Sequence, residues 1–285
     1  MTADKNLKSI PVSAIIFTLN EEIHLPDCLR SVGEFDDVIV VDSFSTDRTK
    51  EICDNAGVRF IQHSFEGFGM QRNWALEHGN PKHDWVLILD ADERVSQELS
   101  SELRELMYSI PTDVSAYRLK RRFYLWGKWL KHSGDYPVWL VRLVNKHKVR
   151  YVNRGHAETQ TVNGKTANLR RDLIDENKKG IDEWVERQNR YSRQEAEYEL
   201  YHESKVFKIV DLCSMDPVKQ RANLKVLSWH IPFRPFFYFM YSYIWHLGFL
   251  DGVEGFIFCM MKAFYQTMIV AKKYELRHKS RASGG

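Results

Sequence analysis

The chain has 285 residues, 44% of them hydrophobic and 28% charged, which is enough ordinary globular sequence for one large domain or one domain with a smaller appendage. Its formal net charge of +3 lacks the polybasic character of bulk nucleic-acid binders, so we expect no nucleic-acid partner. Four widely separated cysteines with no C-x-x-C motif argue against a disulfide scaffold or a zinc ribbon and fit a reducing compartment.

The first ninety residues alternate short apolar runs with segments that carry helix-capping residues. The predicted elements are a strand at 11–19, a helix at 25–32, a strand at 37–41, a helix at 46–56, a strand at 58–62, a helix from 71 to 77 and a strand at 85–89. This alternation indicates βαβ units and a parallel sheet covered on both faces. In such sheets ligands bind beyond the carboxyl ends of the strands.

The pattern changes after residue 107. Residues 118–150 contain ten Lys and Arg residues and a single acid, Asp135. Residues 182–205 predict a long polar helix, and 217–250 combine a dense aromatic cluster with no acid at all. No stretch of the C-terminal region reaches about 18 clean apolar residues, so we expect helices that lie in a membrane interface and none that spans it. An alternative is a buried aromatic core or the interface of a homo-oligomer.

The strongest chemical motif is DAD, in which Asp90 and Asp92 directly follow the apolar run WVLIL. Two carboxylates separated by one residue at a strand end can share a divalent cation and a polyphosphate, because Mg²⁺ and Mn²⁺ take oxygen ligands. The simpler interpretation is a solvated turn in which Asp92 or Ser96 caps the next helix.

Polar residues also follow the other predicted strands. Asp42 ends the apolar run VIVV, where its carboxylate can accept from a base N–H or a ribose hydroxyl, whereas capping alone explains Ser45 and Asp47 after it. TLNEE (18–22) is either a loop that starts a helix or a pocket wall. Arg72 in GFGMQRN stands where a third dinucleotide-binding glycine would be, and it is either a surface residue or a diphosphate ligand.

Several common catalytic motifs are missing from the sequence. It contains no G-x-x-x-x-G-K-[ST], no G-x-S-x-G and no H-E-x-x-H. P-loop phosphoryl transfer, ordinary serine hydrolysis and zinc proteolysis therefore lose support.

Taken in order and spacing, the motifs resemble the family-2 inverting glycosyltransferases with the GT-A fold, strongly over about 11–110. Further segments are similar to the lipopolysaccharide-core glucosyltransferase-like branch of that family. The motifs that carry the resemblance are TLNEE (18–22), VVDSFSTDRT (40–49), GFGMQRN (67–73), LDADE (89–93), RRFYLWGKWLKHSGDYP (121–137), VRLVNKHKVRYVNRGHAE (141–158) and RPFFYFMYSYIWHLGFLDGVEGF (234–256).

The resemblance implies an α/β fold, a GT-A-type nucleotide-sugar-binding domain with a mostly parallel central sheet, followed by a helical C-terminal region. We expect the GT-A domain at 10–215, with the donor site in 11–110 and an acceptor region in 111–215. A helical, aromatic-rich, membrane-apposed region is expected at 216–285.

The resemblance also implies roles for individual residues. Asp42 would hold the nucleobase or ribose, Asp90 would contact the ribose and the metal region, and Asp92 would bind a divalent cation, Mg²⁺ or Mn²⁺. The remaining positions that match the donor pocket are Thr18, Asn20, Glu22 and Arg72. In this branch a histidine often follows the next strand and completes the metal shell. The corresponding DLIDENKKG (172–180) has none, which leaves the third ligand open.

An inverting transfer needs a base that removes the proton of the acceptor hydroxyl. Two acids are candidates. Glu158 lies in GHAE, where the branch usually has a His-Glu pair, and we favour it. Asp135 is surrounded in sequence by cations, which makes it the weaker base or simply a salt-bridge partner.

The expected activity is therefore transfer of a hexose, glucose from UDP-glucose in the first instance, to a lipid-linked or lipopolysaccharide-core saccharide. The cations of 118–150 suggest an anionic glycolipid acceptor or else a solvated face. An acid-free aromatic region and a basic tail favour peripheral contact with the cytoplasmic face of the inner membrane. Alternatives are a non-catalytic nucleotide-sugar-binding or scaffold protein and a nucleotidyltransferase.

Overall fold

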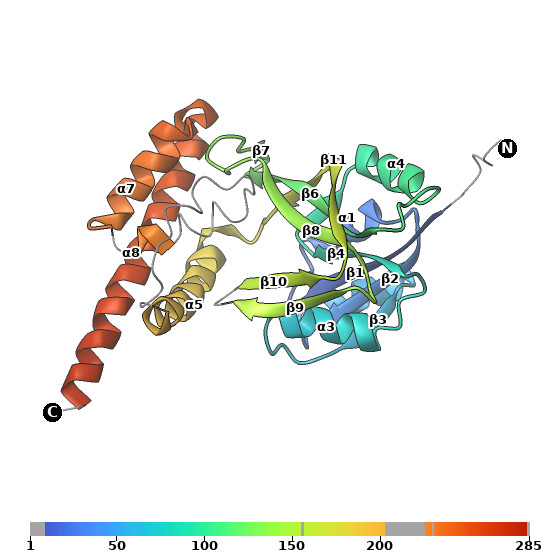
Figure 1. Cartoon of the computed structure of the whole chain (residues 1–285), viewed down its shortest axis with the longest axis horizontal. Helices are drawn as coiled ribbons and strands as arrows, with labels where there is room; N and C mark the ends of the chain where they lie inside the picture. The colour runs from blue at the N-terminus through green and yellow to red at the C-terminus, as the bar shows by residue number, and fades with distance from the viewer. Residues whose placement is uncertain (1–8, 155–156, 203–225, 230, 284–285) are drawn as a thin grey trace. The chain divides into compact units, whose positions relative to one another are not determined.

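The computed structural model describes residues 9–154, 157–202, 226–229 and 231–283. It divides the chain into two compact units, residues 1–180 and 181–285, which are described separately below (Figure 1). The domain boundary predicted at 215–216 lies outside the described residues.

Unit 1 is an α/β unit, as predicted. Its strands are β1 (Ile10–Thr18), β2 (Phe35–Asp42), β3 (Arg59–Gln62), β4 (Trp85–Asp90), β5 (Glu93–Val95), β6 (Val114–Leu125), β7 (Lys128–Trp129), β8 (Val138–Asn145), β9 (Val149–Arg154), β10 (Ala157–Val162) and β11 (Lys165–Glu176). Its helices are α1 (Leu25–Ser31), α2 (Thr49–Ala56), α3 (Phe68–His78) and α4 (Gln97–Leu106). Every element predicted before residue 90 is present. However, α2 begins three residues later than predicted and α3 begins three residues earlier.

The central sheet has the strand order β3-β2-β1-β4-β8-β6-β11-β5, with β7 paired to β6. Strands β3, β2, β1 and β4 are mutually parallel. Strand β8 is antiparallel to both β4 and β6, and β6 is parallel to β11. Strands β1, β2, β3, β4, β6 and β11 therefore all end at one edge of the sheet, here called the carboxyl edge. Strands β9 and β10 form a separate antiparallel pair.

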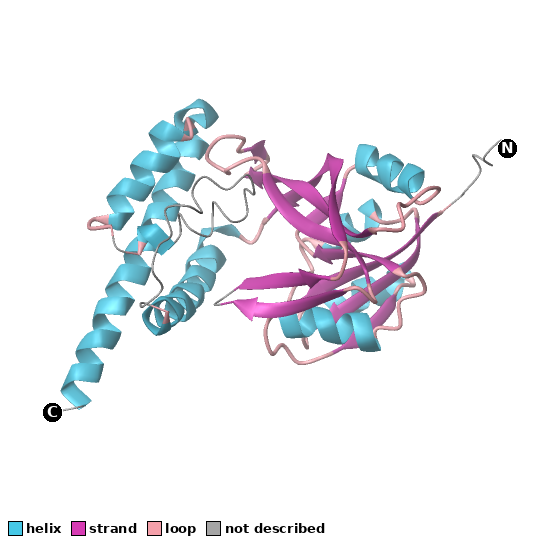
Figure 2. Cartoon of the chain, in the orientation of Figure 1, coloured by secondary structure: helices cyan, strands magenta, loops and turns pink. Residues whose placement is uncertain are grey.

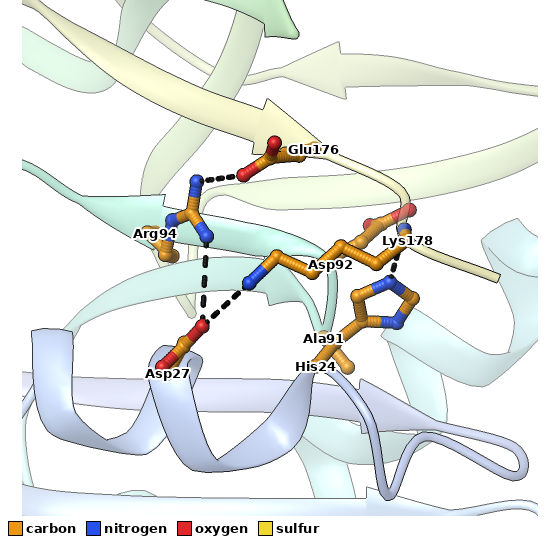
Figure 3. Close-up of a pocket in the computed structure, with 7 residues that line it drawn as sticks. All are labelled: His24, Asp27, Ala91, Asp92, Arg94, Glu176 and Lys178. Carbon is orange, nitrogen blue, oxygen red and sulfur yellow. Dashed lines mark hydrogen bonds and ion pairs between the residues drawn. The ribbon is translucent and has the colours of Figure 1, made fainter. Parts of the chain in front are cut away.

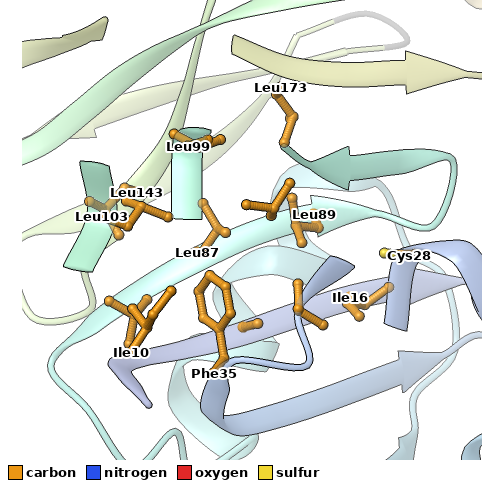
Figure 4. Packing of buried hydrophobic residues seen from close by; sticks show 14 of the residues in the cluster. Ile10, Ile16, Cys28, Phe35, Leu87, Leu89, Leu99, Leu103, Leu143 and Leu173 are labelled. Carbon is orange, nitrogen blue, oxygen red and sulfur yellow. The ribbon is translucent and has the colours of Figure 1, made fainter. Parts of the chain in front are cut away.

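Both faces of the sheet are buried, which explains why its central strands are continuous apolar runs and do not alternate with polar residues. In β4, Leu87 and Leu89 pack in one cluster with Leu99 and Leu103 of α4 (Figure 4), whereas Ile88 packs in a second cluster. Successive strand residues point to opposite faces. The two clusters therefore lie on the two faces of the sheet and fix the position of its carboxyl edge.

Unit 2 is helical, as expected (Figure 2). Its elements are α5 (Gly180–Tyr201), α7 (Arg234–Met240), the π-helix η2 (Tyr241–Trp245), the 3₁₀ helix η3 (Gly248–Asp251) and α8 (Gly252–Ser283). The last residues of the predicted 182–205 helix lie outside the described residues. Fully buried Glu199 of α5 accepts hydrogen bonds from Arg234 (2.7 Å) and Lys273 (2.9 Å), so one carboxylate joins α5, α7 and α8.

One helix among the described residues, Gly248–Lys279, is long and apolar enough to cross a membrane, in contrast with the expectation that none would be. The apolar window of this helix has a mean hydropathy of 1.2, and only 22% of it is buried within the structure. Core helices of soluble proteins pass the same test of length and composition. The result therefore identifies an exposed apolar surface and does not establish a membrane span.

Candidate functional site

The DAD motif lies at the carboxyl edge, where β4 ends at Asp90 and the chain turns through Ala91 and Asp92 into β5. The next helix, α4, is capped by Ser96, whose hydroxyl accepts a hydrogen bond from the Leu99 backbone N–H at 3.2 Å. The capping interpretation is therefore correct for Ser96 and does not account for Asp92.

Asp90 is held between two buried arginines. Its Oδ1 accepts a hydrogen bond from Arg72 Nη2 at 3.1 Å, and its Oδ2 accepts one from Arg142 Nη2 at 2.7 Å. Burial alone would raise the pKa of Asp90, but the charges of Arg142 and Arg72 outweigh it and hold that pKa well below its usual range. Asp90 is therefore a fixed carboxylate at neutral pH.

Glu93, which follows the motif, is the second partner of Arg142. Its Oε1 accepts from Arg142 Nη2 at 2.6 Å, and its Oε2 accepts from the backbone N–H of Asp90 at 2.9 Å. Burial raises the pKa of Glu93 to about 8, against the opposing charge of Arg142. Glu93 and Arg142 together fix both the backbone and the side chain of Asp90.

Asp92 has a different environment. Its Oδ2 accepts a long hydrogen bond from Asn177 Nδ2 (3.4 Å), and its carbonyl accepts from the Glu176 backbone N–H at 3.0 Å. Burial raises the pKa of Asp92 to about 7, and the charges of Asp175 and Asp90 act in the same direction. Negative charge thus accumulates around Asp92. Among the described hydrogen bonds, the Asp92 side chain has an amide as its partner and no arginine.

Arg72 connects the DAD motif to the favoured base. It lies near the start of α3, 3% exposed, and forms an ion pair with Glu158 of β10 in addition to its bond with Asp90. Its guanidinium carbon lies 5.9 Å from the ring centroid of Phe17 and 5.7 Å from that of Tyr151. The structure therefore brings together Asp90, Arg72 and Glu158, three residues far apart in the sequence.

Helix α3 is itself anchored to β9. The Asn73 side chain donates to the Tyr151 carbonyl and accepts from its N–H, both at 2.8 Å, and the Gly69 N–H donates to Asn153 Oδ1 at 2.8 Å. A Cβ on Gly69 would lie 2.9 Å from that oxygen and 3.1 Å from the Asn153 backbone nitrogen, so a larger residue would have to displace this contact. This anchoring places Arg72 within reach of β10.

The other predicted donor residues form a bonded loop system at the same edge. Asp42 is fully buried, and its two oxygens accept hydrogen bonds from Thr18, Ser45 and Gln62. Both the amide oxygen of Asn20 and the carboxylate of Glu22 bind the 46–48 segment. In this structure these residues hold the loops after β1 and β2 together, and their contact with a donor remains a prediction.

Asp135, the second candidate base, lies half-buried in the turn between β7 and β8, with φ of 59°. This turn precedes β8, which begins at the carboxyl edge. Asp135 therefore lies at the same edge of the sheet as Asp90. Neighbouring Tyr136 donates its hydroxyl hydrogen to Asp172 at 3.1 Å.

The basic stretch 118–150 is largely paired inside the fold. Lys120 and Arg122 lie 3.1 and 2.6 Å from the carboxylate of Asp172, and Arg121 lies 3.0 Å from that of Asp175. These acids come from β11, the strand beside β6. Part of the charge that suggested an anionic acceptor therefore belongs to ion pairs within the sheet.

A small hollow beside Asp92 is closed by the segment that follows β11 (Figure 3). The Lys178 backbone N–H donates to His24 Nε2 at 2.7 Å, and His24 Nδ1 lies 2.6 Å from Glu21 Oε2. Both ring nitrogens of this histidine are thus engaged. The residues lining the hollow are His24, Asp27, Ala91, Asp92, Arg94, Glu176 and Lys178.

Sequence reasoning missed Arg142, His24 and Asn177. A signal for Arg142 was present, since an arginine inside the apolar run VWLVRLV needs a buried partner. No three His, Cys, Asp or Glu side chains gather into a metal-binding group in the described part of the chain. The donor set around Asp92 nevertheless fits a hard cation, because Mg²⁺ is commonly bound by one or two carboxylates and completes its shell with water and substrate phosphates.

Comparison with known proteins gives consistent results. The family model described as "Glycosyl transferase family 2" matches residues 13–177. The lipopolysaccharide core biosynthesis glycosyltransferase LpsC of Rhizobium meliloti is 28% identical over 289 residues, covering 97% of this chain and 96% of that protein. An uncharacterized glycosyltransferase of Rickettsia bellii is 28% identical, covering 93% and 86%. The mannosyltransferase PcManGT of Pyrobaculum calidifontis, solved with GDP-Man and Mn²⁺, shares the fold with a TM-score of 0.53 at 14% identity, covering 93% and 87%.

Proposed function

Because the chain belongs to glycosyl transferase family 2, we propose that it transfers a hexose, glucose in the first instance, from a nucleoside-diphosphate sugar to a lipid-linked or lipopolysaccharide-core saccharide, with inversion. The observation that supports this most directly is the gathering of Asp90, Arg72 and Glu158 at the carboxyl edge. The full-length similarity to a lipopolysaccharide-core enzyme supports the acceptor class.

Residues at this edge have distinct tasks in the proposal. Thr18, Asn20, Glu22 and Asp42 hold the nucleoside through their loops, and Arg72 contributes positive charge near the diphosphate. A divalent cation bound at Asp92 would neutralise the negative charge that develops on the departing nucleoside diphosphate. Asp90, fixed by its two arginines, keeps the neighbouring backbone in position for that contact.

Glu158 is the proposed base. Its carboxylate takes the proton of the acceptor hydroxyl as the acceptor oxygen bonds to the anomeric carbon. The bond from that carbon to the diphosphate oxygen breaks with its electron pair on the diphosphate. One displacement from the opposite face inverts the anomeric configuration. The half-buried position of Glu158 beside Arg72 suits a base of this kind because it is reachable and oriented.

We place the protein peripherally on the cytoplasmic face of the inner membrane, where a lipid-anchored acceptor would be accessible. The support comes from unit 2, in which large apolar side chains face outward around the turn from α7 to α8: Trp245 is 80% exposed, Leu250 58% and Val253 70%. Patches of this kind mark membrane or protein contacts. Tryptophan and the acid-free sequence favour lipid.

A donor screen tests the activity. UDP-, GDP- and TDP-sugars are titrated with Mn²⁺ or Mg²⁺, and thermal stabilisation and sugar release are measured. Stabilisation by one nucleotide class and metal-dependent release are the expected results. An absence of both with every donor would overturn the proposal.

Liposome flotation tests the membrane contact. Trp245→Asp combined with Leu250→Asp is expected to abolish flotation with vesicles that contain anionic lipid. Tyr108→Asp, which adds a charge at an exposed aromatic of unit 1, is expected to float like the unaltered protein. Equal flotation of the unaltered protein, the double variant and Tyr108→Asp would refute lipid contact. Lipid contact would also be refuted if the protein were a dimer in solution with unit 2 at its interface.

A further inference from the structure

Arg142 is placed where a charged residue is unusual. It lies in the interior of β8, between Val141 and Leu143, and is 6% exposed. An aliphatic side chain would satisfy this position as part of the sheet, and a buried guanidinium is stable only with close acidic partners. The proposed chemistry uses this arginine only to hold Asp90 in place.

One nitrogen of Arg142, Nη2, donates hydrogen bonds to two carboxylates, at 2.7 Å to Asp90 Oδ2 and at 2.6 Å to Glu93 Oε1. Glu93 is 1% exposed, and its other oxygen accepts the backbone N–H of Asp90. The pair therefore closes a ring of hydrogen bonds around the first residue of the DAD motif, and the ring determines where the Asp90 carboxylate points.

Both carboxylate oxygens of Asp90 therefore accept hydrogen bonds from arginines. Arg72 donates to Oδ1 at 3.1 Å and to Oδ2 at 3.4 Å, and Arg142 donates to Oδ2 at 2.7 Å, so each oxygen already faces a guanidinium. A divalent cation that approached these oxygens would meet two like charges at short range. Asp92, two residues later, has only the long bond from Asn177 on its side chain among the described contacts.

We propose that Arg142 is a positioning residue that withholds the Asp90 carboxylate from metal coordination, so that Asp92 is the member of the pair that binds the cation. The inference rests on the proposed function for the presence of a cation, and it is independent of the sugar and of the acceptor. Its consequence is that removing Arg142 converts Asp90 into an additional metal ligand.

A Mn²⁺ titration of the full-length, donor-free protein tests this consequence. Arg142→Gln removes a positive charge and the 2.7 Å hydrogen bond to Asp90 Oδ2, which then keeps only the long 3.4 Å bond from Arg72, so the Mn²⁺ affinity is expected to rise about tenfold. Asp90→Asn in the unaltered background is expected to leave the affinity within about twofold. Asp90→Asn combined with Arg142→Gln is expected to lose the gain, and Asp92→Asn to lose most of the binding.

A purely structural role for Arg142 gives a different result. The affinity would then stay constant or fall in Arg142→Gln, and either outcome overturns the proposal. A gain that persists in the double variant, or no Mn²⁺ binding by either the unaltered protein or Arg142→Gln, overturns it as well. Nucleotide-sugar binding is measured separately, so failure of the glycosyltransferase assignment remains distinguishable from failure of this inference.

Two further variants guard against loss of folding. Arg142→Gln leaves Glu93 buried beside an uncharged partner, so Glu93→Gln combined with Arg142→Gln replaces both members of the pair and is expected to show the same gain in Mn²⁺ affinity. Arg59→Gln is the matched control, because Arg59 pairs with buried Asp37 at the opposite end of the strands, with 2.6 Å between them. Its Mn²⁺ affinity should equal that of the unaltered protein.

Discussion

Replacing Glu158 with Gln separates the two candidate bases. The amide keeps the size of the side chain and an oxygen that faces Arg72, but it cannot take the acceptor proton. We expect the kcat of transfer to fall about 10²–10⁴-fold, the usual contribution of a general base. The KM for the donor should change little, because Arg72 and Asp90 remain in place.

The fold should tolerate this change. The substitution replaces the ion pair between Glu158 and Arg72 with a contact to a neutral amide, and solvent at the 17% exposed side chain of Glu158 limits the cost. Arg72 keeps its bond to Asp90 at 3.1 Å, so no buried charge is left without a partner. A thermal melt checks that the loss of activity is not a loss of folding.

The matched variant is Asp135→Asn, which removes the competing carboxylate at the same edge. Initial rates with saturating donor and varied acceptor are measured for both variants. Asp135→Asn is expected to retain kcat. If Glu158→Gln remained active while Asp135→Asn lost more than about a hundredfold, a loss of the size a general base contributes, the assignment of the base would be wrong.

Three other changes test separate parts of the structure. Burial would raise the pKa of Asp37, but the hydrogen bonds that Asp37 accepts, including that from Arg59, outweigh burial and lower this pKa. The ionised side chain therefore stabilises the fold at pH values above the unfolded-state pKa, and this stabilisation is lost as the pH falls through the lowered folded-state pKa. Asp37→Asn should cost about 2 kcal/mol in urea unfolding at neutral pH and flatten the acid limb, whereas parallel pH curves would contradict this. Gly255→Ala places a Cβ 2.4 Å from the Gly248 carbonyl oxygen and should destabilise unit 2 by about 1–3 kcal/mol in a melt. Asp92→Asn should abolish transfer with an unchanged circular dichroism spectrum; an active variant would refute its metal role.

The first half of unit 1 was predictable from sequence because its strands are buried on both faces. Runs such as VIVV and WVLIL can bury all their side chains only inside a covered parallel sheet, so β2 and β4 were identified to within about two residues. The polar residues after these runs, Asp42 and Asp90, follow from the same logic. Family resemblance then supplied Glu158, which no local pattern marks.

The second half depended on pairings that sequence does not contain. Lys120, Arg121 and Arg122 read as a basic surface until β11 is placed beside β6, where Asp172 and Asp175 lie opposite them. Such partners are about fifty residues away along the chain and depend on strand order and register. The same holds for the Arg142 pairs with Asp90 and Glu93.

The charges at the carboxyl edge connect these findings. Arg72 and Arg142 face three carboxyl groups, those of Asp90, Glu93 and Glu158, and burial raises the pKa of Glu93 to about 8, so the charges of this group are close to balanced through its own contacts. A group so nearly compensated holds its side chains rigidly and offers little attraction to a cation. The capacity for metal binding therefore falls on Asp92, whose described side-chain partner is an amide. On this argument the two aspartates of the motif differ because β8 delivers an arginine to one of them.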